Sequence, residues 1–451
     1  MQIAKQYLHT TQFTLLENWS VQYFIGNKFS YNKKYDLVRI GDFLKRNKTS
    51  IDIQDVLQYK RVTIKINNGG VFLRDTEKGE NIGTKKQFVI KKGQFLLSKI
   101  DARNGAFGVV PEEVDGAIIT GNFWTFDVDY SKINPHFLSL ITTTSEFISF
   151  SENASNGTTN RHYLQEDLFL NQKIPLPSID EQNRIIKNYN EKIKKAEEHQ
   201  NKADELEKGI ESYLFEELGI RRKKEENKIK GIHFINYKNI TKWGVEYNID
   251  GLKKGILQSS IYNNFRLSEL VYINPQTKLP KTDEEITFLP MECISDKTGE
   301  IKEYRKGIVS KSKGYTKFQE GDLIWARITP CMENGKSAIV KNLINNVGYG
   351  STEYHVLREK REDFNINFLY QLLRTESLRK NAISHFTGSA GQQRVPKSYL
   401  EELEVPLPSI HKQSEIVETI NKIKSEIENL KKLSEQNRKT AEQEFEKEIF
   451  S

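Results

Sequence analysis

Two long stretches of the chain place apolar residues at the spacing of an amphipathic helix. One follows Pro177 and the other follows Pro408, and the apolar positions step mostly by three and four residues. This is the heptad spacing of a coiled-coil seam, so it predicts helices over 180–222 and 411–451. The predicted seam residues are Ile186, Tyr189, Ile193 and Leu206 in the first stretch and Ile416, Ile420, Ile423, Ile427 and Leu430 in the second.

A single helix with so narrow an apolar stripe would leave that stripe in water. Each predicted helix would be about 57–60 Å long at a rise of 1.5 Å per residue. We therefore expect the two helices to pack on each other and to form a strut that partner proteins contact.

Before each long helix, short apolar runs alternate with turn signals. In the first half these runs fall at 87–90, 95–97, 117–120 and 123–126, and glycine and asparagine separate them. Such runs are typical of strands. A helical stretch is expected near 135–149, and again at 367–384. The pattern predicts a mixed α/β globule ahead of each long helix.

The two halves of the chain are copies of one unit. Ile174–Ile179 reads Ile-Pro-Leu-Pro-Ser-Ile, and Val405–Ile410 repeats it as Val-Pro-Leu-Pro-Ser-Ile. A glutamine follows each copy, at Gln182 and Gln413. Three earlier landmarks recur in the same order with nearly the same offset: 19–23 with 243–247, 38–44 with 265–271, and 92–97 with 320–325.

A tandem duplication fixes the expected domain boundaries. We predict a first globule at 1–179, a first helix at 180–222, a charged linker at 223–239, a second globule at 240–410 and a second helix at 411–451. The sequence between the landmarks has diverged, so the copies share a scaffold rather than a surface.

Charge is distributed unevenly over these parts. The chain of 451 residues has a net charge of only +7, which decides little by itself. Residues 180–218 hold seven basic and eleven acidic side chains, and residues 411–451 hold eight basic and nine acidic. The globules and linkers therefore carry an excess of twelve positive charges, as expected of parts that approach a polyanion.

Several classes of protein are excluded. No run approaches the roughly 18 apolar residues of a membrane helix, and the start of the chain lacks the apolar core of a signal peptide. The two cysteines and eight scattered histidines form neither a disulfide framework nor a metal motif. We expect a soluble, cytoplasmic protein with no membrane partner and no metal.

Three motifs that suggest catalysis fail on inspection. Gly335-Lys336-Ser337 has Pro330 where a phosphate loop needs its first glycine. Asn134–Phe137 lacks the second proline of an adenine methyltransferase loop, and a helix start with proline in its first turn explains it better. Glu226–Lys228 lies in the charged linker without a partner carboxylate. We therefore predict no catalytic residue.

The duplicated basic globule, closed by Pro-Leu-Pro-Ser-Ile, a glutamine and a heptad helix, resembles the specificity (S) subunit of type I restriction–modification enzymes. The resemblance extends from about Trp19 to Ser451. It rests on the two proline motifs with Gln182 and Gln413, the strands at 92–97 and 320–325, and the loops at 155–161 and 387–394.

The resemblance implies a DNA-binding role without catalysis. Each globule would be a target recognition domain that reads one half of a split, asymmetric double-stranded DNA target. The two helices would form an antiparallel coiled coil that sets the spacing of the halves. Two adenine-N6 methyltransferase subunits would dock on the chain, and two motor–nuclease subunits would complete the enzyme. S-adenosylmethionine, ATP and Mg²⁺ would belong to those partners, leaving no cofactor on this chain.

Candidate readers of the DNA sit in loops rich in residues that hydrogen-bond to base edges. They are Lys99, Arg103, Asn104, Asn160 and Arg161 in the first copy, and Arg327, Asn334, Lys336, Gln392, Gln393 and Arg394 in the second. Arg161 lies farther before Pro175 than Arg394 lies before Pro406, so these two loops do not superpose strictly.

Two other functions remain open on the sequence alone. One is a stand-alone, sequence-specific DNA-binding regulator without methyltransferase partners. The other is an enzyme that acts within this one chain, which the failed motifs disfavour.

Overall fold

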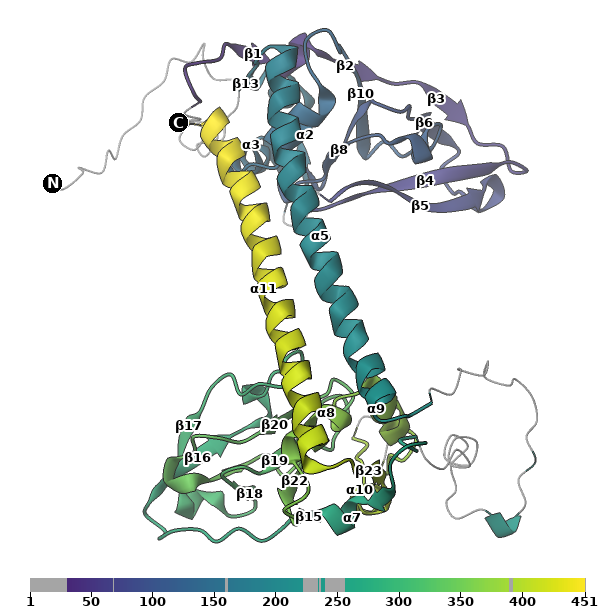
Figure 1. Cartoon of the computed structure of the whole chain (residues 1–451). Coiled ribbons are helices and arrows are strands. Elements are labelled where there is room, and N and C mark those ends of the chain that lie inside the picture. The colour runs from purple at the N-terminus through teal and green to yellow at the C-terminus, as the bar shows by residue number, and fades with distance from the viewer. Residues whose placement is uncertain are drawn as a thin grey trace, which may run out of the picture. The chain divides into compact units, whose positions relative to one another are not determined.

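The computed structural model of the protein describes residues 31–67, 69–158, 161–221, 234, 237–239, 256–388 and 392–450. Trp19, Trp243, Asn160 and most of the predicted linker lie outside these residues. The chain divides into two compact units, Met1–His199 with Lys432–Ser451, and Gln200–Lys431. Each unit thus contains one globule and parts of both long helices. The predicted mixed α/β fold in tandem duplication is confirmed (Figure 1).

The globule of unit 1 is built on two main sheets. The central strand β7 is buried along its whole length, because both faces of this sheet are covered. The four-stranded sheet has the order β2 (Leu44–Asn47), β10 (Phe123–Val128), β7 (Phe95–Ser98), β8 (Phe107–Val109). The five-stranded sheet has the order β3 (Ser50–Asp52), β6 (Lys86–Val89), β9 (Ile118–Ile119), β4 (Gln58–Lys65), β5 (Gly70–Lys78). Two small pairs are β1 (Leu37–Arg39) with β13 (Lys173–Pro175), and β11 (Ser155–Thr158) with β12 (Arg161–Leu164).

The globule of unit 2 repeats this strand order. Its first sheet runs β15 (Val271–Ile273), β22 (Tyr354–Glu359), β19 (Leu323–Ala326), β20 (Ser337–Ile339). Its second runs β17 (Arg305–Ile308), β16 (Glu285–Leu289), β21 (Val347–Gly350), β18 (Thr316–Gln319). The pair β14 (Asn264–Arg266) with β23 (Glu404–Pro406) matches β1 with β13. Unit 1 differs by the additional edge strand β3, by a longer β4–β5 hairpin and by the pair β11–β12, where unit 2 has the isolated bridge between Thr387 and Arg394.

The first sheet of each unit carries a polar pair at the same place, with one buried member. In unit 1 the Gln94 side chain donates to Asp127 (2.6 Å) and accepts from the backbone N–H of Lys91 (2.8 Å). In unit 2 Asp322 accepts two hydrogen bonds from Arg358, at 2.7 and 2.8 Å. Gln94 is 5% exposed and Asp322 is 1% exposed. Both copies thus have a hydrogen-bonded polar pair at this place, but the charges of its two members differ between the copies.

The helical stretches predicted near 135–149 and 367–384 are confirmed, and each consists of two short helices. The chain breaks at Thr144, whose hydroxyl accepts from the N–H of Phe147 and caps a new helix. Asn134 caps the helix before it, with proline in the first turn as expected. The short helices are α2 (Pro135–Thr142), α3 (Ser145–Asn153), α4 (Glu166–Asn171), α7 (Leu267–Leu270), α8 (Ile366–Leu373), α9 (Glu376–Ile383) and α10 (Lys397–Glu402).

The two long helices are α5 (Ile179–Glu217) and α11 (Ile410–Ile449). The first ends before the predicted residue 222, because Gly219 adopts a left-handed conformation with φ of +61°. Serines of the two proline motifs face the first turns, where Ser178 accepts from the N–H of Glu181 and Ser409 from that of Lys412. Among the described residues, no helix combines the length and apolar character needed to cross a membrane.

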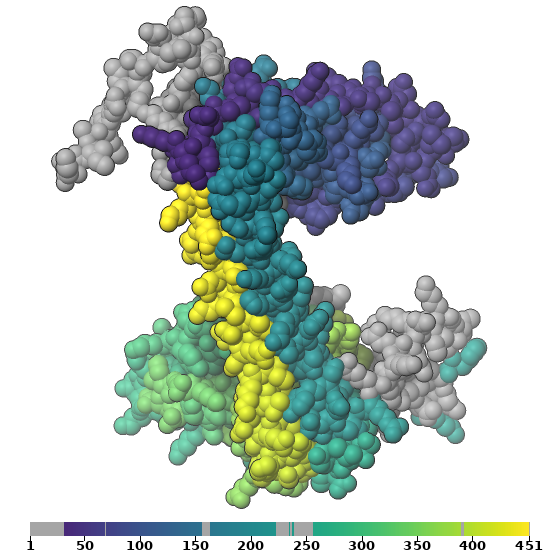
Figure 2. All heavy atoms as spheres, turned by 45° about the horizontal axis from the view of Figure 1, so that its top comes forward, coloured from purple at the N-terminus to yellow at the C-terminus, as the bar shows by residue number. Residues whose placement is uncertain are grey.

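Within each unit, α5 and α11 lie side by side and antiparallel (Figures 1 and 2). The residue numbers on one helix fall as those on the other rise. In unit 1 the ion pairs are Arg184 with Glu448 and Lys192 with Glu444. In unit 2 they are Lys202 with Glu426, Lys412 with Glu217 and Lys431 with Glu207.

The predicted seam residues lie at three kinds of place. Ile416 and Ile420 are fully buried in the main core of unit 2, together with Leu214 and Phe215 of α5. Ile423, Ile427 and Leu430 pack with Ala203 and Leu206 between the two helices of unit 2. Ile186 and Tyr189 pack against the core of unit 1, where the neighbouring Ile185 is more deeply buried. Ile193 is partly buried.

The glutamine after each proline motif fastens the long helix to its globule. Gln182 accepts from the N–H of Asn134 (2.8 Å) and donates to the carbonyls of Lys132 (3.0 Å) and Pro177 (2.9 Å). Gln413 makes the same three bonds, to the N–H of Asn365 and the carbonyls of Asp363 and Pro408. Both side chains are 0% exposed.

Replacing Gln413 by leucine is expected to lower the free energy of unfolding of unit 2 by about 3 kcal/mol. The change leaves three buried backbone groups without partners, and each unsatisfied group costs about 1–3 kcal/mol. Urea unfolding of the full chain measures the loss. Gln436→Leu, at an exposed position of α11, is the matched control. Equal stability of the two variants would contradict the fastening role.

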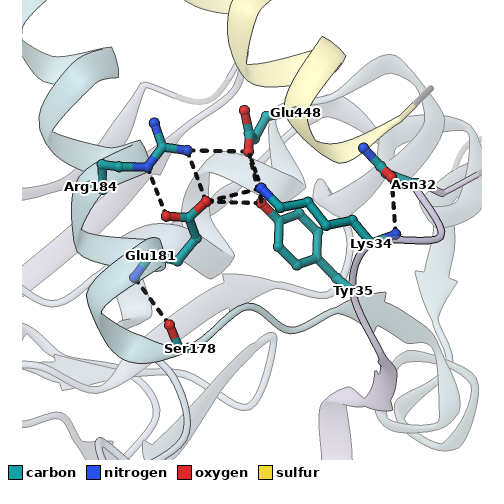
Figure 3. A network of polar contacts seen from close by, with 7 residues as sticks. All are labelled: Asn32, Lys34, Tyr35, Ser178, Glu181, Arg184 and Glu448. Carbon is teal, nitrogen blue, oxygen red and sulfur yellow. Dashed lines mark hydrogen bonds and ion pairs between the residues drawn. The ribbon is translucent and has the colours of Figure 1, made fainter.

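A polar network fixes the start of the described chain to both long helices of unit 1 (Figure 3). Lys34 pairs with Glu181 of α5 and with Glu448 of α11, at 3.2 Å each. The Tyr35 hydroxyl donates to Glu448 (2.7 Å), and Arg184 binds Glu181 through two nitrogens. Hydrogen bonds from Arg184 lower the pKa of Glu181 to about 2. The network therefore keeps its charges over the whole physiological pH range.

Candidate nucleic-acid interface

In both units the turn after the buried central strand is held by the same backbone hydrogen bonds. In unit 1 the N–H of Lys99 donates to the carbonyl of Asn122 (3.0 Å), and the N–H of Leu164 donates to the carbonyl of Lys99 (2.8 Å). In unit 2 the N–H of Arg327 donates to the carbonyl of Glu353 (2.9 Å), and that of Val395 donates to the carbonyl of Arg327 (2.8 Å). Three segments distant in sequence thus meet at one place in each copy.

The side chains at this place form two trios. In unit 1 they are Lys99, Asn122 and Tyr163, and the Lys99 ammonium lies 5.3 Å from the centre of the Tyr163 ring. In unit 2 they are Arg327, Glu353 and Arg394. The backbone frame is shared while every side chain of the trio differs.

Ion pairs join the three side chains of the trio in unit 2. The Arg394 guanidinium donates through Nε and Nη2 to the two oxygens of Glu353, at 2.9 and 2.7 Å. Nε of Arg327 lies 3.7 Å from the same carboxylate. Hydrogen bonds from Arg394 hold the pKa of Glu353 below its usual range. Two positive charges and one negative charge therefore remain together at neutral pH, partly exposed.

The other predicted readers of unit 1 lie close to this place or outside the described residues. Arg103 and Asn104 form a short 3-10 helix with Ala102. Asn104 is exposed, and its carbonyl accepts from the N–H of Asn67, beside the tip of the β4–β5 hairpin (2.7 Å). Nε of Arg103 is buried without a hydrogen-bond partner among the described residues. Arg161 pairs through its backbone with Thr158.

The remaining predicted readers of unit 2 divide into exposed and engaged side chains. Asn334 and Gln392 are exposed, so they can contact a ligand. Lys336 instead donates through Nζ to the carbonyl of Met291 (3.0 Å), which uses one of its donors inside the protein. The carbonyl of Gln393 accepts from the N–H of Thr329 (3.0 Å) and ties the 392–394 loop to the turn after β19.

The structural counterpart of Arg394 is Tyr163 rather than Arg161. Both residues lie twelve positions before the first proline of their motif, and each is followed by the residue that bonds the turn after β7 or β19. Counting back from the proline would have found Tyr163. Asn122 and Glu353, which occupy equivalent places in the repeat, were not predicted either, because the loops around them are poor in basic residues.

The buried side chain of His355 holds the 394–395 segment in place. Its ring Nε2 lies 2.9 Å from the carbonyl of Val395, and Nδ1 lies 3.1 Å from the amide nitrogen of Asn274. The Asn274 amide oxygen accepts from the N–H of Val356 (2.9 Å), which fixes its orientation. Nδ1 therefore faces a donor and must be unprotonated. Burial lowers the pKa of His355 to about 4.

Unit 2 is expected to lose stability as the pH falls from about 6.5 to about 4. In the unfolded chain His355 takes up its proton near pH 6.5, whereas in the folded chain its pKa is about 4. The stabilisation is complete above pH 6.5 and is lost with a slope of up to about 1.4 kcal/mol per pH unit. Urea unfolding at pH 7 and pH 5 measures it. The difference in free energy of unfolding between wild type and His355→Gln should be smaller at pH 5 than at pH 7. The same difference at both pH values would show that His355 does not cause the loss.

The described parts of the two globules hold no cluster of metal ligands. No group of three histidine, cysteine or acidic side chains is placed there to hold a metal ion. The charged side chains of the trio in unit 2 instead pair with one another and stay partly exposed. Such an arrangement can bind a charged polymer.

Comparison with protein families identifies the repeated unit. The family described as type I restriction modification DNA specificity domain matches twice, at residues 32–208 and 260–436. The separation of the two matches is the spacing of the repeat. Together they cover most of the chain, so the protein belongs to this family.

Two curated relatives come from Escherichia coli. The type I restriction enzyme EcoEI specificity subunit is 39% identical over 162 residues, which are 35% of this chain and 27% of the relative. The EcoAI specificity subunit is 38% identical over 152 residues, 34% of this chain and 26% of the relative. Each match spans about a quarter of the relative's length.

One solved structure shows the same fold over nearly the whole chain. It is described as the structural basis underlying complex assembly and conformational transition of the type I R-M system. The match has a TM-score of 0.55 at 16% identity and covers 93% of this chain and 97% of that chain.

Proposed function

We propose that this chain is the DNA specificity subunit of a type I restriction–modification complex, and that each globule reads one half of a bipartite, asymmetric target. The observation that carries the proposal is the pair of trios. The same backbone bonds present lysine, asparagine and tyrosine in unit 1, and arginine, glutamate and arginine in unit 2. One frame with different polar side chains is what reading two different half-sites requires.

In this proposal the long helices serve assembly. They bear more acidic than basic side chains, so they are poorly suited to DNA and well suited to protein partners. We propose that the antiparallel pair of α5 and α11 sets the spacing of the half-sites and docks two adenine-N6 methyltransferase subunits. Two motor–nuclease subunits would complete the restriction enzyme.

The chemistry is assigned to the partners. S-adenosylmethionine would be bound by the methyltransferase subunits, and ATP and Mg²⁺ by the motor–nuclease subunits. This chain would select the DNA sequence and hold no catalytic residue or cofactor of its own.

Co-expression with the methyltransferase subunit of its own host tests the proposal. We expect a stable complex that methylates adenine in one bipartite sequence, which sequencing of methylated genomic DNA identifies. A chain that binds DNA but captures no methyltransferase would instead be a stand-alone regulator. Methyl transfer by the isolated chain would make it an enzyme, and either result would overturn the proposal.

A further inference from the structure

The Arg394 guanidinium is held on one edge and leaves donors for a ligand. A guanidinium has five N–H donors in a rigid plane. Within the described residues, Nε and Nη2 hydrogen bond to Glu353, and Nη1 donates to the carbonyl of Gln392 at 2.8 Å. One donor on Nη1 and one on Nη2 remain. They belong to adjacent nitrogens, and the side chain is 31% exposed.

Two donors from one planar group match one base edge in particular. In the major groove guanine presents two acceptors, N7 and O6, and a bidentate arginine is their commonest specific partner. Adenine offers one acceptor and one donor at the same places. A guanidinium that is kept in one orientation therefore discriminates guanine from adenine.

Glu353 is the residue that keeps this orientation. Its two oxygens bind one edge of Arg394, and its carbonyl accepts from the N–H of Arg327, so side chain and backbone are fixed together. An arginine that is already ordered loses less conformational entropy on binding than a free one. Arg327 lies 3.7 Å from the same carboxylate, which also offsets the repulsion between the two cations.

We infer that Arg394 reads a guanine in the half-site bound by unit 2, and that Glu353 is the positioning residue that makes this reading specific. The inference rests on the proposed function and names one base of its target. Unit 1 has Asn122 in place of Glu353 and Tyr163 in place of Arg394. Its half-site therefore does not require a guanine at the equivalent position.

Selection of bound DNA from a randomised duplex pool tests the inference. The full chain is used in its complex with the methyltransferase subunit. We expect wild type to select one guanine strongly in one half-site. Glu353→Gln should lower the preference for that guanine over adenine about 10-fold, since a good bidentate contact discriminates by roughly that factor or more. The other half-site should be unchanged.

A matched control and a double variant separate positioning from folding. Asp363 binds Arg361 through both oxygens, as Glu353 binds Arg394, so Asp363→Asn removes the same kind of pair elsewhere in unit 2. It should leave base preference intact. With Arg394→Ala already present, Glu353→Gln should cause no further loss of guanine preference, because the carboxylate acts through that arginine.

The outcomes distinguish this inference from the proposed function. Wild type that binds no duplex sequence-specifically would overturn both. Wild type that selects a bipartite target, with an unchanged guanine preference in Glu353→Gln, would overturn only the role of Glu353. An equal loss of affinity for every sequence would show that Glu353 is merely structural, and would also overturn the inference.

Discussion

Replacing Ile420 by aspartate is expected to unfold the core of unit 2, with a loss on the order of 5 kcal/mol. Ile420 is 0% exposed and lies in the cluster that joins α11 to Leu214 of α5 and to the globule. The variant loses the apolar burial of a large side chain, about 2–5 kcal/mol. It also places a carboxylate where the cluster is apolar, and burial of an unpaired charge is costly. Limited proteolysis with mass spectrometry, across a temperature series, measures which unit opens.

The neighbouring position provides the control. Asn421 is exposed on the same helix, so Asn421→Asp introduces the same carboxylate without burying it. We expect this variant to resemble wild type in cleavage and in methyltransferase capture. Ile420→Asp should lose both the protected core of unit 2 and the partner. If it retains normal assembly, the seam has been assigned to the wrong residues.

Replacing Arg394 by alanine is expected to weaken binding of the cognate duplex by roughly 10- to 100-fold, which corresponds to about 1–3 kcal/mol for one base-reading arginine. The loss should be confined to one half-site, because the residue belongs to the trio of unit 2 alone. Binding is measured by titrating duplexes in which either half-site is scrambled. Compared with wild type, the variant should distinguish less well between the cognate duplex and a duplex in which the half-site of unit 2 is scrambled. It should distinguish a duplex with a scrambled unit 1 half-site as well as wild type does.

Arg361→Ala is the matched control for this experiment. It removes the same charge and a similar paired geometry from unit 2, since Arg361 binds Asp363 at 2.8 and 2.7 Å. A nonspecific electrostatic effect would lower affinity in both variants and for all sequences. Equal damage to both half-sites by Arg394→Ala would remove this arginine from the reading surface.

The architecture could be predicted from the sequence because periodicity and repetition report backbone structure directly. The Pro-Leu-Pro-Ser-Ile motifs located both helix starts, and the two glutamines proved to make identical buried bonds. The end of α5 was misjudged because Gly219, rather than the charged run that follows, stops the helix. The position of the break at Thr144 could not be predicted, because a capping threonine interrupts a helix without interrupting its apolar spacing.

The trios were harder to foresee. Lys99, Arg327 and Arg394 were predicted because lysine and arginine commonly hydrogen-bond to base edges. Glu353 is acidic and Tyr163 is aromatic, so a search for basic and amide side chains does not select them. They come together only through long-range backbone bonds between segments that are far apart in the sequence. Residue type along the chain carries no information on those bonds, whereas the nearly constant offset between the two repeats does.

The polar pair in the first sheet of each unit has a genetic consequence. Two homologous repeats in one gene are open to recombination with each other. A crossover that copied only Asp322 and β19 into the first repeat would produce Gln94→Asp opposite Asp127. Two carboxylates would then lie side by side, one of them buried, and their repulsion would favour protonation of one. Gln94 and Asp127 come from neighbouring strand segments, so an exchange between the repeats avoids that conflict only if it carries both segments together.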